Sequence, residues 1–156
     1  MGKRKVLAQF TEVPTMRTIA EINRALVEAG ARQILMQYDG AGAVTGMSFS
    51  LENNKQTAIY SLPARVEPVY EILTKDRYYT FNEKQMRVQA EKTAWRILLR
   101  WVEAQLALIQ VGMVTADEVL LPYRQVADGR TVYQVVKSGD RLERLALPEA
   151  KVEKSQ

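Results

Sequence analysis

Three cations recur at intervals of four residues within one amphipathic segment of the sequence. Lys92, Arg96 and Arg100 lie in the stretch QAEKTAWRILLRWVEAQLALI, which also holds both tryptophans. Side chains four residues apart are neighbours on a helix, and like charges placed in this way repel by roughly 0.2–0.5 kcal/mol per pair. The stripe has two interpretations: a solvated face relieved by nearby glutamates, or a surface that binds nucleic-acid phosphates or an acidic protein.

A tyrosine-rich loop and a basic amino terminus are two further candidate binding segments. The loop KDRYYTFNEK interleaves cations with aromatic rings, a composition that pairs with phosphates and stacks on bases. The alternative is that its tyrosines lie on the core with their hydroxyl groups in water. The candidate residues for binding a nucleic acid or another partner are therefore Lys3, Arg4, Lys5, Arg77, Tyr78, Tyr79, Lys92, Arg96 and Arg100.

Catalytic signatures are missing from the sequence. It contains no histidine and no cysteine, which excludes imidazole-dependent triads, thiolate nucleophiles and thiolate metal sites. Gly40, Gly42 and Gly46 resemble a dinucleotide-binding fingerprint, but the third glycine is one place late and a strand is expected to follow, so they indicate a turn. We expect no enzyme activity, no cofactor and no bound metal. A hydrolase whose scattered carboxylates converge in space is the alternative that the sequence leaves open.

The composition is typical of one globular domain. The chain has 156 residues, of which 47% are apolar and 26% charged, and its net charge is +4. This length suits a single compact core. We expect a basic amino-terminal arm over residues 1–14, one domain over residues 15–138, and a charged, loosely ordered tail over residues 139–156. No apolar run is long and uncharged enough to cross a membrane, so we expect a cytoplasmic protein.

Helical periodicity recurs in three segments. The expected helices span residues 19–29, 68–75 and about 85–111. Thr18 and Glu21 form a capping box for the first helix, and Gly30 ends it as a left-handed cap. The third helix is long, buries a broad apolar side and stops at Gly112. Thr115 opens a second capping box.

Alternating apolar residues predict the strands of an antiparallel sheet. The expected strands cover residues 32–39, 46–52 and 57–62, and the short loops between them indicate a meander. Asp128-Gly129 lies between two alternating segments and predicts a carboxy-terminal β-hairpin. The fold class is therefore α+β, with a three-stranded meander plus a hairpin, and with a long helix and two shorter helices packed on one face.

The two faces of this predicted sheet differ in chemistry. The face expected to be buried carries Met36, Tyr38, Met47, Phe49, Leu51, Tyr60 and Leu62. The other face carries Gln33, Gln37, Ser48, Ser50, Thr57 and Ser61. This polar face is either a platform for single-stranded nucleic acid or a protein, or the ordinary wet side of an antiparallel sheet. It lacks the stacking aromatics that an RNA-recognition platform requires.

Several short motifs together resemble one protein family. They are TIAEI (18–22), GA (30–31), YD (38–39), LPAR (62–65), QAEKTAWR (89–96), WVEAQ (101–105) and LPY (121–123). This set is similar to a family of small uncharacterised proteins encoded by bacteriophages, prophages and other mobile elements, over about residues 15–136. None of the motifs is a known catalytic signature, so the resemblance implies a biological context and no activity.

The expected function combines this context with the basic charge. The resemblance implies either an accessory factor of DNA replication or recombination, or a protein that disables a host defence. Our first hypothesis is a non-enzymatic nucleic-acid-binding accessory protein that prefers single strands. The alternative is a counter-defence protein that binds and inhibits a host defence protein. A further hypothesis is a homodimer in which Trp95 or Trp101 contacts the same residue of the second copy.

Overall fold

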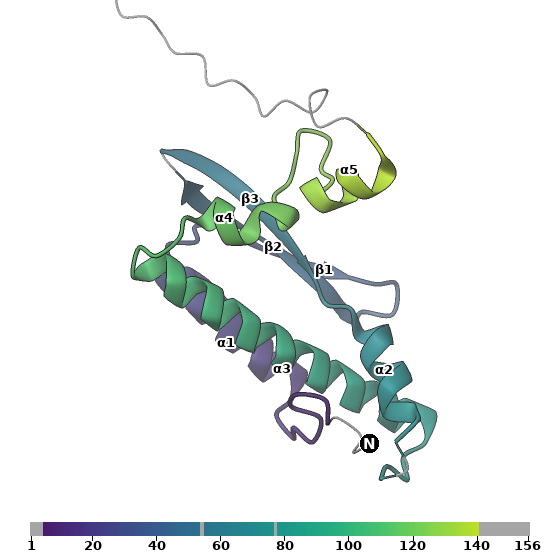
Figure 1. Ribbon diagram of the computed structural model, residues 1–156. Coiled ribbons are helices and arrows are strands. Elements are labelled where there is room, and N and C mark those ends of the chain that lie inside the picture. The colour runs from purple at the N-terminus through teal and green to yellow at the C-terminus, as the bar shows by residue number, and fades with distance from the viewer. Residues whose placement is uncertain (1–4, 54, 77, 141–156) are drawn as a thin grey trace, which may run out of the picture.

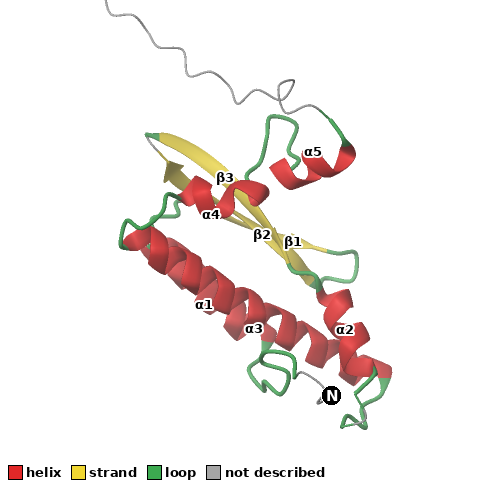
Figure 2. Cartoon of the chain, in the orientation of Figure 1, coloured by secondary structure: helices red, strands yellow, loops and turns green. Residues whose placement is uncertain are grey.

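The computed structural model describes residues 5–53, 55–76 and 78–140 (Figure 1). Along the chain, helices and strands follow one another in the order shown in Figure 2. Their bounds are α1 Thr15–Glu28, β1 Ile34–Tyr38, β2 Val44–Asn53, β3 Gln56–Pro63, α2 Val66–Thr74, α3 Glu83–Gln110, α4 Ala116–Leu120, the 3₁₀ turn η1 Leu121–Tyr123 and α5 Val132–Ser138.

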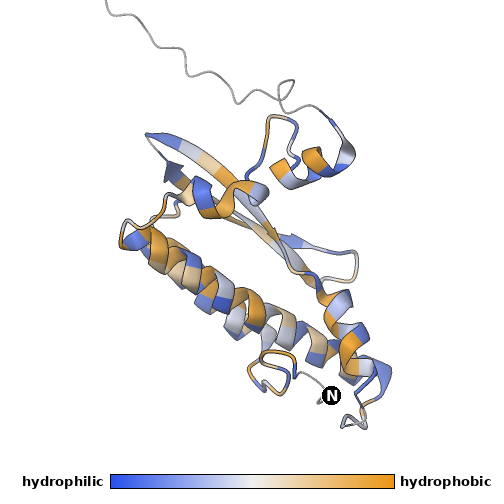
Figure 3. Cartoon of the chain, in the orientation of Figure 1, coloured by the Kyte–Doolittle hydropathy of each residue, from blue (hydrophilic) through white to orange (hydrophobic). Residues whose placement is uncertain are grey.

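The architecture is α+β, as the sequence predicted. The three strands form one antiparallel sheet in the order β1-β2-β3. Helices α1 and α3 lie side by side along one face of this sheet, and α2 lies at one end of it (Figure 1). Hydrophobic residues recur along both long helices (Figure 3). The main core therefore lies between this helix pair and the sheet, and α4 adds Ala116 and Leu120 to it.

Helix α3 forms where the periodicity placed it. Its first turn is closed by a capping box, in which the Asn82 side chain accepts from the Gln85 amide and the Gln85 side chain accepts from the Asn82 amide. The helix ends at Gln110, and the next left-handed residue is Gly112, with φ +75°. Trp95 is fully buried, whereas Trp101 is half-buried. Of the two tryptophans, only Trp101 is thus accessible to a second copy of the chain.

Helix α1 begins earlier than predicted. It starts at Thr15, directly after Pro14, and its first turn has no side-chain cap. The predicted capping box at Thr18 is therefore wrong. Thr18 lies inside the helix and is fully buried, because α1 extends far enough to pack this residue against α3. The predicted end is confirmed: Gly30 has φ +100°, and the Ala31 amide closes the cap on the Leu26 carbonyl.

The apolar face predicted for the sheet is buried in β2 and β3, whereas in β1 Met36 is only half-buried and Tyr38 is exposed. Met47, Phe49, Leu51, Tyr60 and Leu62 all lie in the core. The prediction for Tyr38 is wrong, since this side chain is 59% exposed. The register of the β1–β2 pair shifts between Gln37 and Tyr38, and this irregularity turns the end of β1 away from the core.

The glycine-rich segment after β1 is the turn of a β-hairpin. The Asp39 carboxylate accepts hydrogen bonds from the amides of Ala41 and Ala43, both at 2.9 Å. Gly46 lies within β2, where a Cβ atom would approach the Leu62 carbonyl oxygen to 2.7 Å. These glycines therefore serve the backbone geometry of the sheet.

The polar face of the sheet is partly covered by the protein's own chain. A row of side-chain hydrogen bonds crosses it. The side-chain amide of Gln37 donates to the Ser48 hydroxyl, the hydroxyls of Ser48 and Ser61 share a bond of 2.7 Å, and the side-chain amide of Gln125 donates to the Ser61 hydroxyl over 2.6 Å. The backbone amide of Gln125 also bonds the Ile59 carbonyl at the edge of β3. Ser48 is consequently buried, although it was predicted to lie on the polar outer face.

The predicted carboxy-terminal hairpin forms its turn, but neither of its two arms is a strand. The amide of Val126 bonds the Arg130 carbonyl across Asp128-Gly129, and an isolated bridge joins Gln125 to Thr131. The next residues then form helix α5, so the prediction of a strand there is wrong. Thr131 caps this helix in a reciprocal pair with Gln134, and the buried Val135 holds it in place. The capping box predicted at Thr115 is confirmed at the start of α4.

A cluster of polar residues ties β3 to α4 and to the segment after η1. The Tyr60 hydroxyl donates a hydrogen bond to Asp117 over 2.7 Å, and the Arg124 guanidinium forms a salt bridge with the same carboxylate. Tyr60 is fully buried and Arg124 is nearly so. Burial raises the pKa of the Tyr60 hydroxyl, and its hydrogen bond to Asp117 raises it further.

Replacing Asp117 by alanine is expected to lower the free energy of unfolding by about 3 kcal/mol, because Arg124 would remain as a buried charge without its carboxylate. Urea unfolding followed by circular dichroism measures this loss. Asp128→Ala is the matched control, since Asp128 pairs with Arg130 in solvent and is expected to matter far less. Equal losses in the two variants would contradict the structural role of Asp117.

The raised pKa of Tyr60 predicts a pH dependence in alkaline solution. The folded protein holds this proton more tightly than the unfolded chain, so its contribution is fully present below the unfolded pKa of about 10 and is lost as the pH rises above that value. Unfolding free energies between about pH 9 and pH 11 are therefore expected to fall less steeply in Tyr60→Phe than in the wild type. Parallel pH profiles would rule out this contribution.

Candidate nucleic-acid interface

The basic amino-terminal segment and the tyrosine-rich loop come together at one end of the molecule. Both lie beside α2 and the start of α3 (Figure 1). The side-chain amide of Gln9 donates to Asp76 over 2.5 Å, and the Tyr79 hydroxyl donates to the Gln9 carbonyl over 2.6 Å. Burial raises the pKa of the Tyr79 hydroxyl. The amino-terminal segment and the tyrosine-rich loop, about seventy residues apart in the sequence, therefore lie next to each other in the fold.

Helix α3 holds the amino-terminal segment in place. The side-chain amide of Gln89 donates to the carbonyls of Gln9 and Thr11, both at 3.0 Å. Thr93 donates to the carbonyl of Ala8, a residue with φ +58°. A left-handed backbone at a residue other than glycine persists only where the surroundings fix it. These bonds make residues 6–11 a fixed turn on the helix.

Four aromatic rings pack together on this anchored turn and loop. Phe10 and Tyr78 meet edge to face with ring centres 4.9 Å apart, and Tyr79 lies 5.4 Å from Tyr78 and 5.2 Å from Phe81. Three of the four rings remain open to solvent: Tyr78 is 71% exposed, Phe10 46% and Phe81 43%. We call Phe10, Tyr78, Tyr79 and Phe81 the aromatic cluster. Exposed rings grouped in this way can stack on planar ligands.

One cation contacts the aromatic cluster, and two more lie at the ends of the tyrosine-rich loop. The Lys5 ammonium lies 5.7 Å from the centre of the Phe10 ring, within the range of a cation–π contact. Lys75 and Lys84 are exposed on the two sides of the loop. The other three predicted candidates from these segments, Lys3, Arg4 and Arg77, lie outside the described residues. The cluster thus pairs stacking surface with cations able to meet phosphates.

The cationic stripe of α3 is interrupted at its centre. Arg96 forms a salt bridge of 3.0 Å with Glu21 of α1 and also donates to the Thr18 hydroxyl, so only 19% of its side chain is exposed. Lys92 is half-buried and Arg100 is exposed, and neither has a salt bridge within the part of the chain that the structure describes. The carboxylate that neutralises the middle of the stripe therefore comes from another helix and not from α3 itself.

Sequence reasoning omitted Phe10 and Phe81 from the candidate residues. Phe81 lies in the tyrosine-rich loop that was singled out, and Phe10 follows the basic amino terminus by a few residues. The signal for Phe10 is an aromatic residue close behind a run of cations. It points to the cluster only once the two segments are known to meet.

Other chemistry finds little support in the described residues. Within residues 5–53, 55–76 and 78–140, no three acidic side chains lie close enough together to hold a metal ion. Burial raises the pKa of Glu91, and the nearby charge of Asp39 raises it further. No helix in the described part of the chain is long and apolar enough to span a bilayer.

Comparisons with protein-family models, curated proteins and solved structures found no match to this chain. The resemblance to a family of mobile-element proteins therefore stays a prediction from the motifs. Function has to be argued from the site itself.

Arg96→Ala is expected to lower the free energy of unfolding by about 1–2 kcal/mol, because it removes a hydrogen-bonded ion pair from the α1–α3 interface. Arg100→Ala is the matched control on the same helix, and its exposed side chain predicts a change below about 0.5 kcal/mol. Urea unfolding of both variants measures the difference. If Arg96→Ala were as stable as the control, Arg96 would be available for a ligand after all.

Proposed function

We propose that this protein is a non-enzymatic factor that binds single-stranded nucleic acid through the aromatic cluster and the cations around it. The observation that carries the proposal is the exposure of Phe10, Tyr78 and Phe81 beside Lys5. A protein under selection for stability alone gains by burying such rings. Here they stay in water, on backbone that side-chain hydrogen bonds hold fixed.

The proposed preference for single strands follows from which base faces an aromatic ring can stack on. Base faces are covered in a duplex and open in a single strand, so stacking favours unpaired bases whatever their sequence. Phosphates on both sides of a stacked base would meet Lys5, Lys75 and Lys84. Lys3, Arg4 and Arg77 add charge to the same segments in the sequence. Affinity supplied in this way depends strongly on salt and weakly on sequence.

The mobile-element context suggested by the motifs is compatible with this activity. Replication and recombination expose single strands, and a small accessory protein without catalytic machinery binds or protects them. We therefore favour this function over a protein-binding inhibitor of a host defence system.

Tyr78→Ala is expected to weaken binding to a labelled single-stranded oligonucleotide by about 5- to 150-fold, because one stacked base contributes roughly 1–3 kcal/mol. Fluorescence anisotropy with a mixed-sequence single strand, and with the same sequence as a duplex, measures the affinities. Tyr133→Ala is the control, since Tyr133 is also exposed but lies on α5, away from the cluster (Figure 1). Its affinity is expected to equal that of the wild type.

The salt dependence of the same titration tests the cations. Lys5→Gln is expected to reduce the slope of log affinity against log salt by about 0.7, the contribution of one phosphate contact on a single strand. Absence of binding at both low and moderate salt, or equal binding of single strand and duplex, would overturn the proposal. A partner recovered from nuclease-treated host lysate would then favour the protein-binding alternative.

A further inference from the structure

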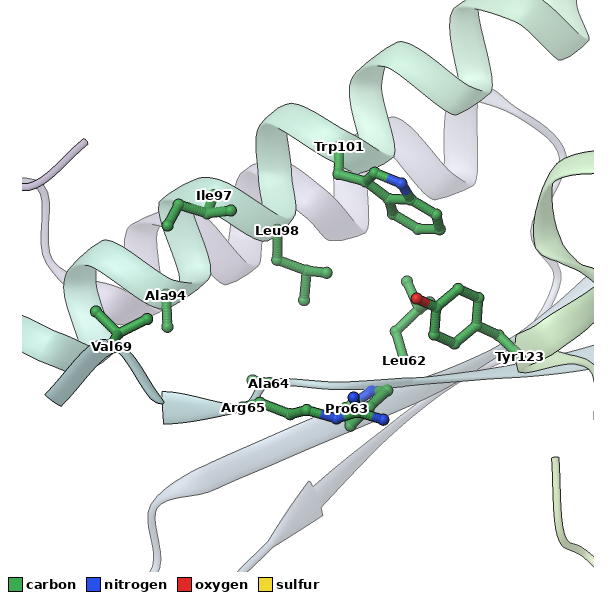
Figure 4. A pocket seen from close by; sticks show the side chains of 10 residues that line it. All are labelled: Leu62, Pro63, Ala64, Arg65, Val69, Ala94, Ile97, Leu98, Trp101 and Tyr123. Atoms are coloured by element: carbon green, nitrogen blue, oxygen red, sulfur yellow. The ribbon is translucent and has the colours of Figure 1, made fainter. Parts of the chain in front are cut away.

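A hollow opens between the middle of α3 and the end of β3. It has a volume of about 270 Å³ and is roofed by side chains that reach from α3 toward the strand (Figure 4). Ile97, Leu98 and Trp101 form this roof, and Leu62 lies opposite them. Tyr123 closes one end, where its ring meets Trp101 edge to face at 5.3 Å. The walls are therefore largely apolar.

The lining of this hollow includes one cationic side chain, that of Arg65. Arg65 lies between β3 and α2, it is exposed, and its guanidinium carbon is 5.8 Å from the centre of the Tyr133 ring. Within residues 5–53, 55–76 and 78–140 no carboxylate lies in salt-bridge range of Arg65, unlike Arg96, Arg124 and Arg130. Among the described residues, Arg65 therefore contacts the aromatic ring of Tyr133 and no carboxylate.

A second, polar hollow adjoins the first. Its volume is about 180 Å³, and it shares Pro63, Arg65 and Tyr123 with the apolar hollow. Its remaining walls are rich in amides and hydroxyls, including those of Gln125 and Thr131. Arg65 therefore lines both an apolar hollow and a polar one. This arrangement of an apolar wall with a few converging polar groups is that of small-molecule sites.

We propose that these two hollows bind a small amphipathic carboxylate, with its apolar body under α3 and its carboxylate on Arg65. A guanidinium presents paired N–H donors that match the two oxygens of a carboxylate. The hollow is too small for more than a short alkyl chain or a single ring system, which sets the size of the ligand. The site shares no residue with the aromatic cluster, so the proposal is independent of nucleic-acid binding.

Octanoate is a suitable probe, and 1-octanol is its uncharged counterpart of equal chain length. Trp101 lies in the wall, so tryptophan fluorescence reports binding, and nuclear magnetic resonance of the backbone amides locates it. Octanoate is expected to bind at least tenfold more tightly than octanol. Arg65→Gln is expected to remove that difference while leaving octanol binding unchanged.

Two further variants make the test specific. Ile97→Phe narrows the hollow from the half-buried side of α3 and is expected to weaken both probes, with circular dichroism confirming that the variant is folded. Arg24→Gln removes an exposed cation from α1 and is expected to change neither affinity. Equal affinities for octanoate and octanol in the wild type would overturn the role of Arg65. Failure of both probes, or binding only of an acidic peptide, would overturn the proposed ligand class.

Discussion

Helix α3 has to bury side chains against the sheet and against α1 at the same time, and most of the structure depends on this requirement. Its Trp95 is completely buried, although the indole N–H has no hydrogen-bond acceptor among the described residues. An unpaired N–H costs about 1–3 kcal/mol. Burial of the ring area contributes roughly 4–6 kcal/mol, so apolar burial outweighs the lost hydrogen bond and fixes the position of the helix.

Covering α3 on its second side changes the role of its cations. Once α1 lies along the helix, Arg96 faces Thr18 and Glu21, and a charge that would repel its neighbours on an isolated helix becomes a polar contact between two helices. A pair of this kind also fixes how far α1 can slide along α3, because a shift by one turn would separate the charges. Arg96, the central cation of the stripe, therefore has a structural role between the two helices.

Local patterns predicted the parts of the fold in which pattern and surroundings agree. The alternation in β2 and β3 and the periodicity of α3 were sufficient, because each buried face has one period over many residues. The segment after Asp128-Gly129 alternates in the same way, yet Thr131 caps it and Val135 anchors it as a helix. Similarly, Tyr38 follows the alternation of β1 but lies beyond a register shift that no local signal reveals.

In the candidate site, too, some residues could be predicted from local sequence and others only from tertiary contacts. Composition was enough to single out Tyr78 and Tyr79, whereas the place of Phe10 depends on hydrogen bonds such as the one between Gln9 and Asp76, 67 residues apart. Those hydrogen bonds satisfy the polar groups of the amino-terminal turn, whereas the rings of Phe10 and Tyr78 remain exposed to solvent. Folding therefore bears the entropy cost of ordering both segments, so a ligand that stacked on the rings would not have to order them again.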